Sequence, residues 1–442
     1  MRTVGVGIVG LGTVGGGTYR LIERHRDKYR DAYGIDLKVV RACSLDEAAA
    51  HAMGVPEGVW TRDWHEVTGC PEIDIVVEVI GGEHPATEIF EDAFAHGKHM
   101  VTANKALLGR HVDELADAAA HAGVQLRCEA ACGGGIPIVN ALEHALIGNE
   151  HLTVAGILNG TTNYILSRMD AEGLGYAEVL ADAQRLGYAE ADPTADVDGF
   201  DAASKLAILS SIAFHSRVTT DDVYMQGIRD ITADDIEQAH DLGMRIKLLA
   251  VGRNTPEGVD VRVHPAMIPA DHQLAAVNGA MNAVYAVGDA VGPTMFYGAG
   301  AGAFPTASAI VGDILALSES IARGIAPLPE AEPFARELAI RSIDDLETRY
   351  YVRLRVEDRV GALAETVGVF ARHDISISQI NQLERDGGET GACSVIFLTH
   401  RAIERNMAAA ADDLAKSTCV RSVANVIRIE DVDAWTDGVL DN

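Results

Sequence analysis

Continuous apolar runs, separated by amphipathic stretches, organise the first third of the chain. Apolar runs at residues 3–9, 73–80 and 98–103 are typical of strands buried on both faces of a parallel sheet. Further strands and the helices between them are expected at residues 15–29, 36–42, 85–96, 107–122 and 124–129. This alternation predicts an α/β, doubly wound domain of Rossmann type over residues 1–130.

From residue 152 the pattern changes. A strand at 152–160 and a helix at 160–169, capped by Thr161 or Thr162, are followed by an apolar helix at 200–214. Short strands with turns between them are then expected at residues 245–252, 259–268, 282–289 and 292–302. They predict a mixed or antiparallel sheet with helices on one face, and so an α+β domain over residues 131–304.

The last part of the chain repeats a strand–helix order. Residues 326–347 are rich in Pro and Glu and are expected to be a linker. Beyond them the pattern predicts strands and helices in the order βαββαβ, at residues 350–357, 362–374, 375–383, 393–399, 402–416 and 420–429. Leu363, Val367 and Phe370 are expected on one face of the first helix. This order predicts a ferredoxin-like domain over residues 348–432.

Composition narrows the class of protein. The chain has 442 residues, 48% of them hydrophobic, and a formal net charge of −29. That charge argues against nucleic acid and anionic membranes as partners. No apolar run is long enough to span a bilayer. The scattered cysteines and the absence of a basic-then-apolar leader pattern favour reduced thiols in the cytoplasm.

A glycine-rich turn follows the first strand. Gly10, Gly12 and Gly15, with Thr13 and Val14 between them, form G-x-G-x-x-G between a strand and a helix. Glycines at these places let the backbone approach a pyrophosphate at the helix N-terminus. The motif predicts a dinucleotide site, with NAD or NADP as cofactor.

The end of the second strand bears on which cofactor binds. NAD-binding folds usually place an acid there, which takes the ribose 2′-hydroxyl. Here the strand ends in Arg41-Ala42-Cys43-Ser44. Arg41 is expected to face a 2′-phosphate, which favours NADP, and the alternative is an ordinary surface arginine.

Two lysines stand in chemically suggestive places. Lys105 follows the strand at 98–103, where side chains of a doubly wound sheet face the ligand crevice. Lys205 ends a turn-rich segment with many acids, among them Glu190, Asp196 and Asp201. Asp201 and Lys205 are four apart and share one face of the expected apolar helix. We interpret the charged first turn of that helix as facing a cleft; the alternative is an exposed pair of little energetic weight.

A second glycine-rich stretch, residues 130–138, follows Glu129. Its glycines free the backbone to direct carbonyls inward, and hard cations prefer oxygen ligands. A plain hinge between domains explains the same residues equally well. Cys132 also permits a third interpretation, a nucleophilic thiol like that of semialdehyde dehydrogenases that form acyl intermediates.

The segment from Ala183 to Lys205 resembles the signature of homoserine dehydrogenases, and the resemblance covers nearly the whole chain. The matching positions are Ala183, Gly187, Tyr188, Asp192, Pro193, Asp196, Gly199, Asp201 and Lys205. The resemblance implies NAD(P)H-dependent, reversible reduction of L-aspartate 4-semialdehyde to L-homoserine, a step toward threonine, methionine and isoleucine. It implies that Lys205 is the acid, assisted by Lys105.

The same resemblance implies further roles. Glu190 and Asp201 would hold the ends of the substrate, and Asp196 would hold Lys205. Gly187 and Gly302 would lie at the cofactor, and the helix at 305–325 would return to the first domain. A sodium or potassium ion would bind the Glu129 side chain and the backbone of Cys132, Gly134 and Ile136.

The C-terminal domain resembles an ACT domain, which binds amino acids at the turn after its first strand, where Gly361 stands. Threonine is the effector that the resemblance implies, in a homodimer or homotetramer; the alternative is a domain that only dimerises.

Two other functions are compatible with these motifs. An oxidative semialdehyde dehydrogenase would use Cys132 as its nucleophile and would lose activity on Cys132→Ser. A nucleotide-binding regulatory protein would sense amino acids without turnover.

Overall fold

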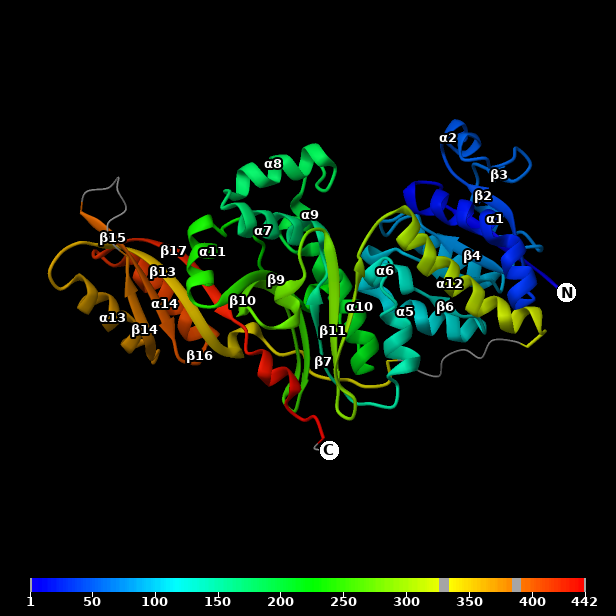
Figure 1. Ribbon diagram of the computed structural model, residues 1–442. Helices are drawn as coiled ribbons and strands as arrows, with labels where there is room; N and C mark the ends of the chain where they lie inside the picture. The colour runs from blue at the N-terminus through cyan, green and yellow to red at the C-terminus, as the bar shows by residue number, and fades with distance from the viewer. Residues whose placement is uncertain (1, 326–333, 384–390, 441–442) are drawn as a thin grey trace.

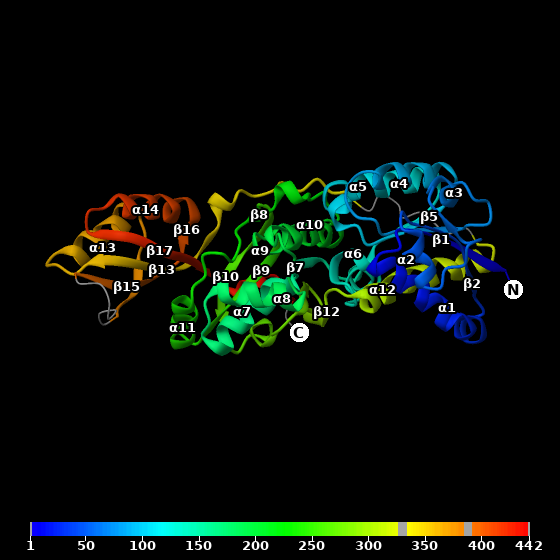
Figure 2. The same ribbon diagram turned by 90° about the horizontal axis from the view of Figure 1, so that it is seen from above.

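The computed structural model describes residues 2–325, 334–383 and 391–440, which form an elongated row of three bodies (Figure 1). The N-terminal sheet and its helices lie at one end, a large sheet with helices lies in the middle, and a smaller α/β body lies at the other end. The same row is seen from above (Figure 2). The predicted fold class is confirmed.

The first sheet is parallel throughout, in the order β3-β2-β1-β4-β5-β6. Its strands are β1 (Thr3–Val9), β2 (Asp36–Cys43), β3 (Trp60–Thr61), β4 (Ile75–Glu78), β5 (His99–Thr102) and β6 (Leu126–Arg127). Along β4, Ile75 and Val77 join one apolar core while Val76 joins another. Both faces of the sheet are therefore buried, which explains the continuous apolar runs.

Helices cover the two faces of this sheet. The core on one face is shared with α1 (Thr13–Tyr33) and α12 (Ala303–Ala322), and the core on the other with α4 (Ala86–Ala95) and α5 (Lys105–Ala122). A Cβ on Gly17 of α1 would lie 2.7 Å from the carbonyl oxygen of Ala303. The absence of a side chain at Gly17 thus lets α12 pack closely on α1.

The second sheet has 11 strands and runs through both the middle and the C-terminal bodies. The middle strands are β7 (His151–Ile157), β8 (Tyr224–Met225), β9 (Met244–Thr255), β10 (Gly258–Pro269), β11 (Met281–Gly288) and β12 (Gly292–Ala299). The neighbours from β12 through β11, β7 and β9 to β10 are antiparallel, as predicted. The prediction of short strands was wrong for β9 and β10, which have 12 residues each.

The C-terminal body has the ferredoxin-like order. Its elements are β13 (Glu347–Glu357), α13 (Ala362–Arg372), β14 (Ile377–Gln382), β15 (Ala392–Thr399), β16 (Ala402–Ile403), α14 (Glu404–Lys416) and β17 (Val420–Ile429). Ala362, Thr366, Val369 and Phe370 form the buried face of α13. Leu363, which was expected to share a face with Phe370, is 38% exposed.

The two bodies share one sheet because β17 pairs in parallel with β10. Residues 334–347, the described part of the expected linker, form bridges to Ser216 and Val259, while 326–333 lie outside the described residues. After β17 the chain returns to the middle body, where the side chain of Trp435 is fully buried beside Tyr285 and His272. No pattern in the sequence indicated this return.

Local differences also appear beside the expected site. A short helix, α6 (Glu129–Gly133), stands where an irregular cation loop or hinge was expected. The helix α7 (Gly160–Glu172) is capped by Asn159, whose side chain accepts from the Thr162 backbone N–H, and not by Thr161 or Thr162. No helix in the described ranges is both long and apolar enough to cross a membrane.

Candidate active site

A cleft of about 580 Å³ lies where the two larger bodies meet. It is lined by the end of the first sheet, by α6, by the start of α7, by the acidic segment before α10 (Phe200–Phe214) and by the turn before α12. Lys105, Lys205, Glu190, Asp196, Asp201, Val14, Gly187 and Gly302 all line it. Residues far apart in the sequence thus meet in one cavity.

Asp201 stands between two lysines inside this cleft. Its Oδ2 accepts from the Lys205 Nζ at 2.7 Å, and its Oδ1 pairs with the Lys105 Nζ at 2.7 Å. Lys205 is 6% exposed and Asp201 9%, whereas the Lys105 side chain is 44% exposed. The ion pair that the Asp201–Lys205 spacing predicted is therefore present. It is buried in the cleft and does not lie on the open surface.

The two lysines set the charge of this carboxylate. Burial alone would raise the pKa of Asp201, but Lys205 and Lys105 together hold that pKa well below its usual value. In return, burial lowers the pKa of Lys105 while Asp201 raises it, with a net rise. Asp201 is thus charged at neutral pH and favours the charged form of its neighbour.

The helix α10 positions the pair. Gly199 precedes its first residue as the N-cap with φ 94°, a conformation that a side chain would strain. Beyond its first turn nearly every residue is buried, including Leu206 and Leu209. A buried, rigid helix holds Asp201 and Lys205 in one orientation toward the cleft.

Two asparagines complete the cleft and were missed in the sequence. The Asn159 Nδ2 donates to Asp196 Oδ1 at 2.7 Å and to Asp201 Oδ2 at 2.8 Å, while its Oδ1 caps α7. Asn282 is buried, and within the described chain its Oδ1 has no hydrogen-bond partner. The one signal in the sequence was that Asn159 precedes a predicted helix, which indicates a helix cap.

The N-terminus of α7 faces the same cleft. Gly160 and Thr161, its first residues, line the cavity opposite Tyr188 and Glu190. The Thr161 hydroxyl donates to the Tyr188 carbonyl at 2.8 Å, which ties the two walls together. The unpaired N–H groups of a helix N-terminus attract a carboxylate.

A second cleft of about 840 Å³ opens over the glycine turn. Gly10, Gly12 and Thr13 line it, and Val14 faces the first cleft. A Cβ on Gly15 would lie 1.8 Å from the Gly10 carbonyl oxygen, so Gly15 serves the tight turn. At Gly12 nothing lies within 4 Å of such a Cβ, which leaves room for a pyrophosphate to approach the backbone.

Arg41 does not line this second cleft. Its Nη1 donates to the carbonyls of Val40 at 3.0 Å and Gly58 at 3.1 Å. Arg62, just after β3, lines the cleft together with Ser44 and Asp46. The sequence analysis missed Arg62 because β3 has only two residues and gave no strand pattern.

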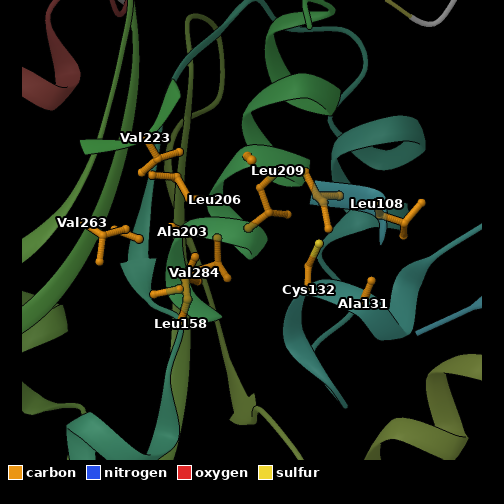
Figure 3. Close-up of a cluster of buried hydrophobic side chains, with 14 of the residues drawn as sticks. Leu108, Ala131, Cys132, Leu158, Ala203, Leu206, Leu209, Val223, Val263 and Val284 are labelled. Carbon is orange, nitrogen blue, oxygen red and sulfur yellow. The ribbon is translucent and has the colours of Figure 1, made fainter. Parts of the chain in front are cut away.

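Cys132 lies in an apolar core and not in the cleft. Its side chain is 0% exposed and packs near Leu108 and Leu209 (Figure 3). Burial raises the pKa of its thiol, and the charge of Glu129 raises it further. A neutral, enclosed thiol is a poor nucleophile, which argues against the oxidative alternative.

Glu129 is buried at the start of α6. Its two carboxylate oxygens accept the backbone N–H groups of Val139 at 2.9 Å and Asn140 at 2.7 Å. Gly134 adopts φ 57° close to Gly300. Among the described residues, no three His, Cys, Asp or Glu side chains are grouped to hold a metal ion.

Family models match three successive parts of the chain. Residues 10–129 match "Homoserine dehydrogenase, NAD binding domain", residues 137–315 match "Homoserine dehydrogenase" and residues 350–416 match "ACT domain". Curated relatives named homoserine dehydrogenase align over nearly the full length. Those of Mycobacterium tuberculosis and Corynebacterium glutamicum are each 44% identical, cover 97% of this chain, and are themselves covered over 98% and 96%.

Solved structures agree with these matches. A homoserine dehydrogenase from Thiobacillus denitrificans superposes with a TM-score of 0.91 at 42% identity, over 98% of this chain and 99% of that one. A mutant of a hyperthermophilic archaeal homoserine dehydrogenase in complex with NADPH has a TM-score of 0.61 at 25% identity, over 71% and 97%.

Proposed function

Because this chain belongs to the homoserine dehydrogenase family, we propose that Lys205 is the acid of its reaction and that Asp201 holds that acid in place. The chain interconverts L-aspartate 4-semialdehyde and L-homoserine with a nicotinamide cofactor. The observation that supports the assignment of the acid is the Lys205–Asp201–Lys105 arrangement in the cleft, in which the Lys205–Asp201 pair is buried.

Lys205 has one N–H left for the substrate. An ammonium has three donors, and two of those on Lys205 go to the Leu158 carbonyl and to Asp201, each at 2.7 Å. The third is free to donate to the aldehyde oxygen. The nicotinamide supplies the hydride when bound, while Lys205 stabilises the developing alkoxide and protonates it.

The remaining groups hold the amino-acid end of the substrate. We place its carboxylate at the first turn of α7, beside Gly160 and Thr161, and its ammonium near Glu190 and Asp196. This changes one predicted role, since Asp196 accepts from Asn159 and stands better opposite the ammonium than beside Lys205. The Asn282 Oδ1 is a further acceptor for an N–H of substrate or cofactor.

We propose NADP as the cofactor because Arg62 lines the second cleft. An arginine at this edge of the cleft suits a 2′-phosphate. The carboxylate of Asp46 caps α2 (Glu47–Ala52) by accepting from the Ala49 N–H at 2.9 Å, which leaves it less available to a ribose hydroxyl. Arg41, turned to carbonyls, is not needed for this preference.

A monovalent cation, Na⁺ or K⁺, is proposed at Glu129 with the carbonyls of Cys132, Gly134 and Ile136. The donor set suits such an ion, because all four groups offer oxygen. Each Glu129 oxygen accepts one N–H and keeps a lone pair for a cation. The ion would fix the turn after α6, where Gly134 lies against the backbone of Gly300.

The proposal also includes an amino-acid effector and a subunit assembly. The ACT match supports binding of an amino-acid effector, and we propose threonine, in a homodimer or homotetramer. All six cysteines are free, which fits a cytoplasmic enzyme. The domain division at residues 130, 304, 347 and 432 remains a prediction.

The acid is tested by comparing wild type with Lys205→Met. The measurement is oxidation of NADPH and NADH with aspartate semialdehyde, followed at the nicotinamide absorbance, beside equilibrium binding of the cofactor. We expect kcat to fall about 10²–10⁴-fold while cofactor still binds.

Lys416→Met, at an exposed lysine of α14, is the matched control and should retain full turnover. Turnover of Lys205→Met within a few-fold of wild type would contradict the assignment. Cys132→Ser should keep the activity, whereas loss of turnover in a folded Cys132→Ser protein would revive the thiol mechanism.

A further inference from the structure

A buried lysine of the middle body lies behind one wall of the catalytic cleft. Lys247, on β9, is 3% exposed. Its Nζ donates to the Val277 carbonyl at 2.7 Å, to the Asn278 Oδ1 at 3.0 Å and to the Asn163 Oδ1 at 3.4 Å. Because an ammonium has three donors, these three acceptors match the capacity of the charged lysine.

No carboxylate contacts this ammonium. Within the described ranges Lys247 forms no ion pair, and the charges that act on it are those of Asp170 on α7 and Arg245 on β9. Asp170 itself pairs with Arg245 and with His240 of α11 (Ala233–Asp241). Buried charges are ordinarily paired, and a methionine would fill a similar space without a charge to desolvate. The lysine at this place therefore calls for an explanation.

The three acceptors join a loop to a helix. Residues 277–280, which precede β11, supply two of them. The third, Asn163, lies in the first turn of α7, and its Nδ2 donates to the carbonyls of Val277 at 3.2 Å and Met281 at 2.9 Å. Lys247 and Asn163 thus bind the same Val277 carbonyl, and together they hold the loop against α7.

The end of this loop reaches the catalytic cleft. Ala280 and Asn282 line the cleft, as does Gly160 at the start of α7. A Cβ on Gly160 would lie 2.8 Å from the Ala280 carbonyl oxygen and 3.3 Å from the Asn282 Oδ1. The loop therefore packs directly on the first residue of α7, where we place the carboxylate of the substrate.

We propose that Lys247 is a positioning residue for the substrate, which holds the loop at residues 277–280 so that this loop and the N-terminus of α7 meet the amino-acid end of the substrate at a fixed spacing. This inference rests on the substrate placement proposed above and extends it to a residue that does not line the cleft. The charge of Lys247, next to Asn163 in the first turn of α7, also adds to the positive end of that helix.

The protonation of Lys247 gives this role a signature. Burial lowers the pKa of Lys247 to about 8, since the opposing effects of Asp170 and Arg245 on it are smaller. Below that pH the ammonium donates to all three acceptors. As the pH rises through about 8 it becomes an amine with two donors, so its hold on the loop and its charge near α7 are both weakened.

The test measures oxidation of L-homoserine by wild type, Lys247→Met and Lys247→Arg, with whichever of NADP⁺ and NAD⁺ turns over faster, from about pH 6.5 to about pH 9.5. At neutral pH we expect the KM for homoserine to rise at least tenfold in Lys247→Met, with a smaller change in kcat and unchanged cofactor affinity. In wild type KM should rise as the pH passes about 8. Lys247→Met should lack that rise, because its KM is high throughout.

Lys247→Arg keeps the charge over this whole range and should recover part of the affinity for homoserine, again without a rise near pH 8. Homoserine has an amino group of its own that titrates equally with every variant, so the difference between wild type and variant isolates the lysine. Thermal melts show which variants are folded.

Lys98→Met is the matched control. Lys98 is also buried, and its Nζ donates to the carbonyls of Cys70 at 2.8 Å and Ile73 at 2.7 Å, away from both clefts. This variant should keep the wild-type KM. An equal rise of KM in Lys98→Met would show that loss of any buried lysine weakens substrate binding, and it would overturn the positioning role.

Asn278→Ala keeps the test decisive if Lys247→Met does not fold. Asn278 is exposed, and the change removes one acceptor of the ammonium. The pKa of Lys247 should then fall, so the rise in KM should begin at a lower pH than in wild type. A rise that stays in place in Asn278→Ala would contradict the proposal.

A wild-type KM in folded Lys247→Met, or a pH profile of KM with the same shape as that of wild type, would overturn the positioning role. A wild-type KM in Asn282→Ala beside a raised KM in Lys247→Met would instead support Lys247 and overturn the proposed contact of Asn282. The acid is decided separately, by the kcat of Lys205→Met.

Discussion

Asp201 is the residue on which the chemistry of the cleft depends, because one carboxylate serves two lysines. Its charge raises the pKa of Lys105 against the opposing effect of burial, and its Oδ2 also fixes Lys205. The substrate therefore meets two lysine side chains that this carboxylate holds in a fixed orientation. An isolated lysine in this environment would tend to lose its proton, because burial disfavours the charged form.

Replacing Asp201 by Asn should change the pH dependence of turnover. Without the carboxylate the pKa of Lys105 falls, so the loss of activity at high pH should begin at a lower pH than in wild type. We expect kcat to drop by about 10–100-fold as well. The measurement is the rate of semialdehyde reduction from about pH 6 to about pH 10.

Glu190→Gln is the control for that experiment, because Glu190 lines the rim of the cleft. It should raise KM and leave the high-pH limb in place. An unchanged limb in Asp201→Asn would show that the pKa of Lys105 does not depend on this carboxylate.

Asn159 has two separable roles, as helix cap and as donor to two carboxylates. Asn159→Ser keeps an oxygen that can cap α7 and removes the amide donors. We expect kcat/KM to fall at least tenfold, with a melting temperature near that of wild type. Asn159→Ala removes the cap too and should cost about 1 kcal/mol more in the free energy of unfolding, measured by urea denaturation. A wild-type kcat/KM in Asn159→Ser would show that Asn159 acts only as a helix cap.

At the scale of elements, the contact between α1 and α12 brings the turn before α12 to the catalytic cleft. Gly17 permits that contact, whereas Gly12 faces open space at the second cleft. We expect Gly17→Ala to lower the free energy of unfolding by about 1–3 kcal/mol through overpacking. Gly12→Ala should leave stability nearly unchanged and weaken cofactor binding. Urea denaturation and cofactor titration of both variants check this, and the reverse assignment of effects would contradict it.

The sequence predicted elements better than it predicted their partners. The strand β1 and the strand β17 begin and end at the predicted residues, because long apolar or alternating runs between turn signals mark such strands. Lys205 and Asp201 could be paired from spacing alone. Arg62 and Asn159 could not be identified as site residues from the sequence, because the roles proposed for them depend on tertiary contacts and not on a local pattern.

At the scale of the whole molecule, the ACT domain and the middle body are joined through one continuous sheet. The pairing of β10 with β17 continues a single sheet, and Arg262 pairs with both Asp260 and Glu430 across it. Removing the ACT domain would expose the edge of β10, so point variants are a cleaner test of regulation than truncation.

Trp435 fastens the returning C-terminal segment to the middle body. It is fully buried, its Nε1 donates to Glu430 at 3.0 Å and its carbonyl accepts from the Thr153 hydroxyl at 3.0 Å. We expect Trp435→Ala to reduce the free energy of unfolding by about 3–5 kcal/mol, measured by urea denaturation. Leu440→Ala, at an exposed position of the same segment, should cost less than about 0.5 kcal/mol. Equal effects of the two would mean that the segment is only loosely attached.

The position of β17 after the other ACT strands also bears on the order in which the sheet can form. While the ribosome is still translating the ACT domain, β10 has its partner β9 on one side and an incomplete edge on the other. Unpaired strand edges on nascent chains invite aggregation. The middle body therefore gains its last sheet partner only after β17 has been made, and until then the edge of β10 beyond β8 stays open to wrong pairing.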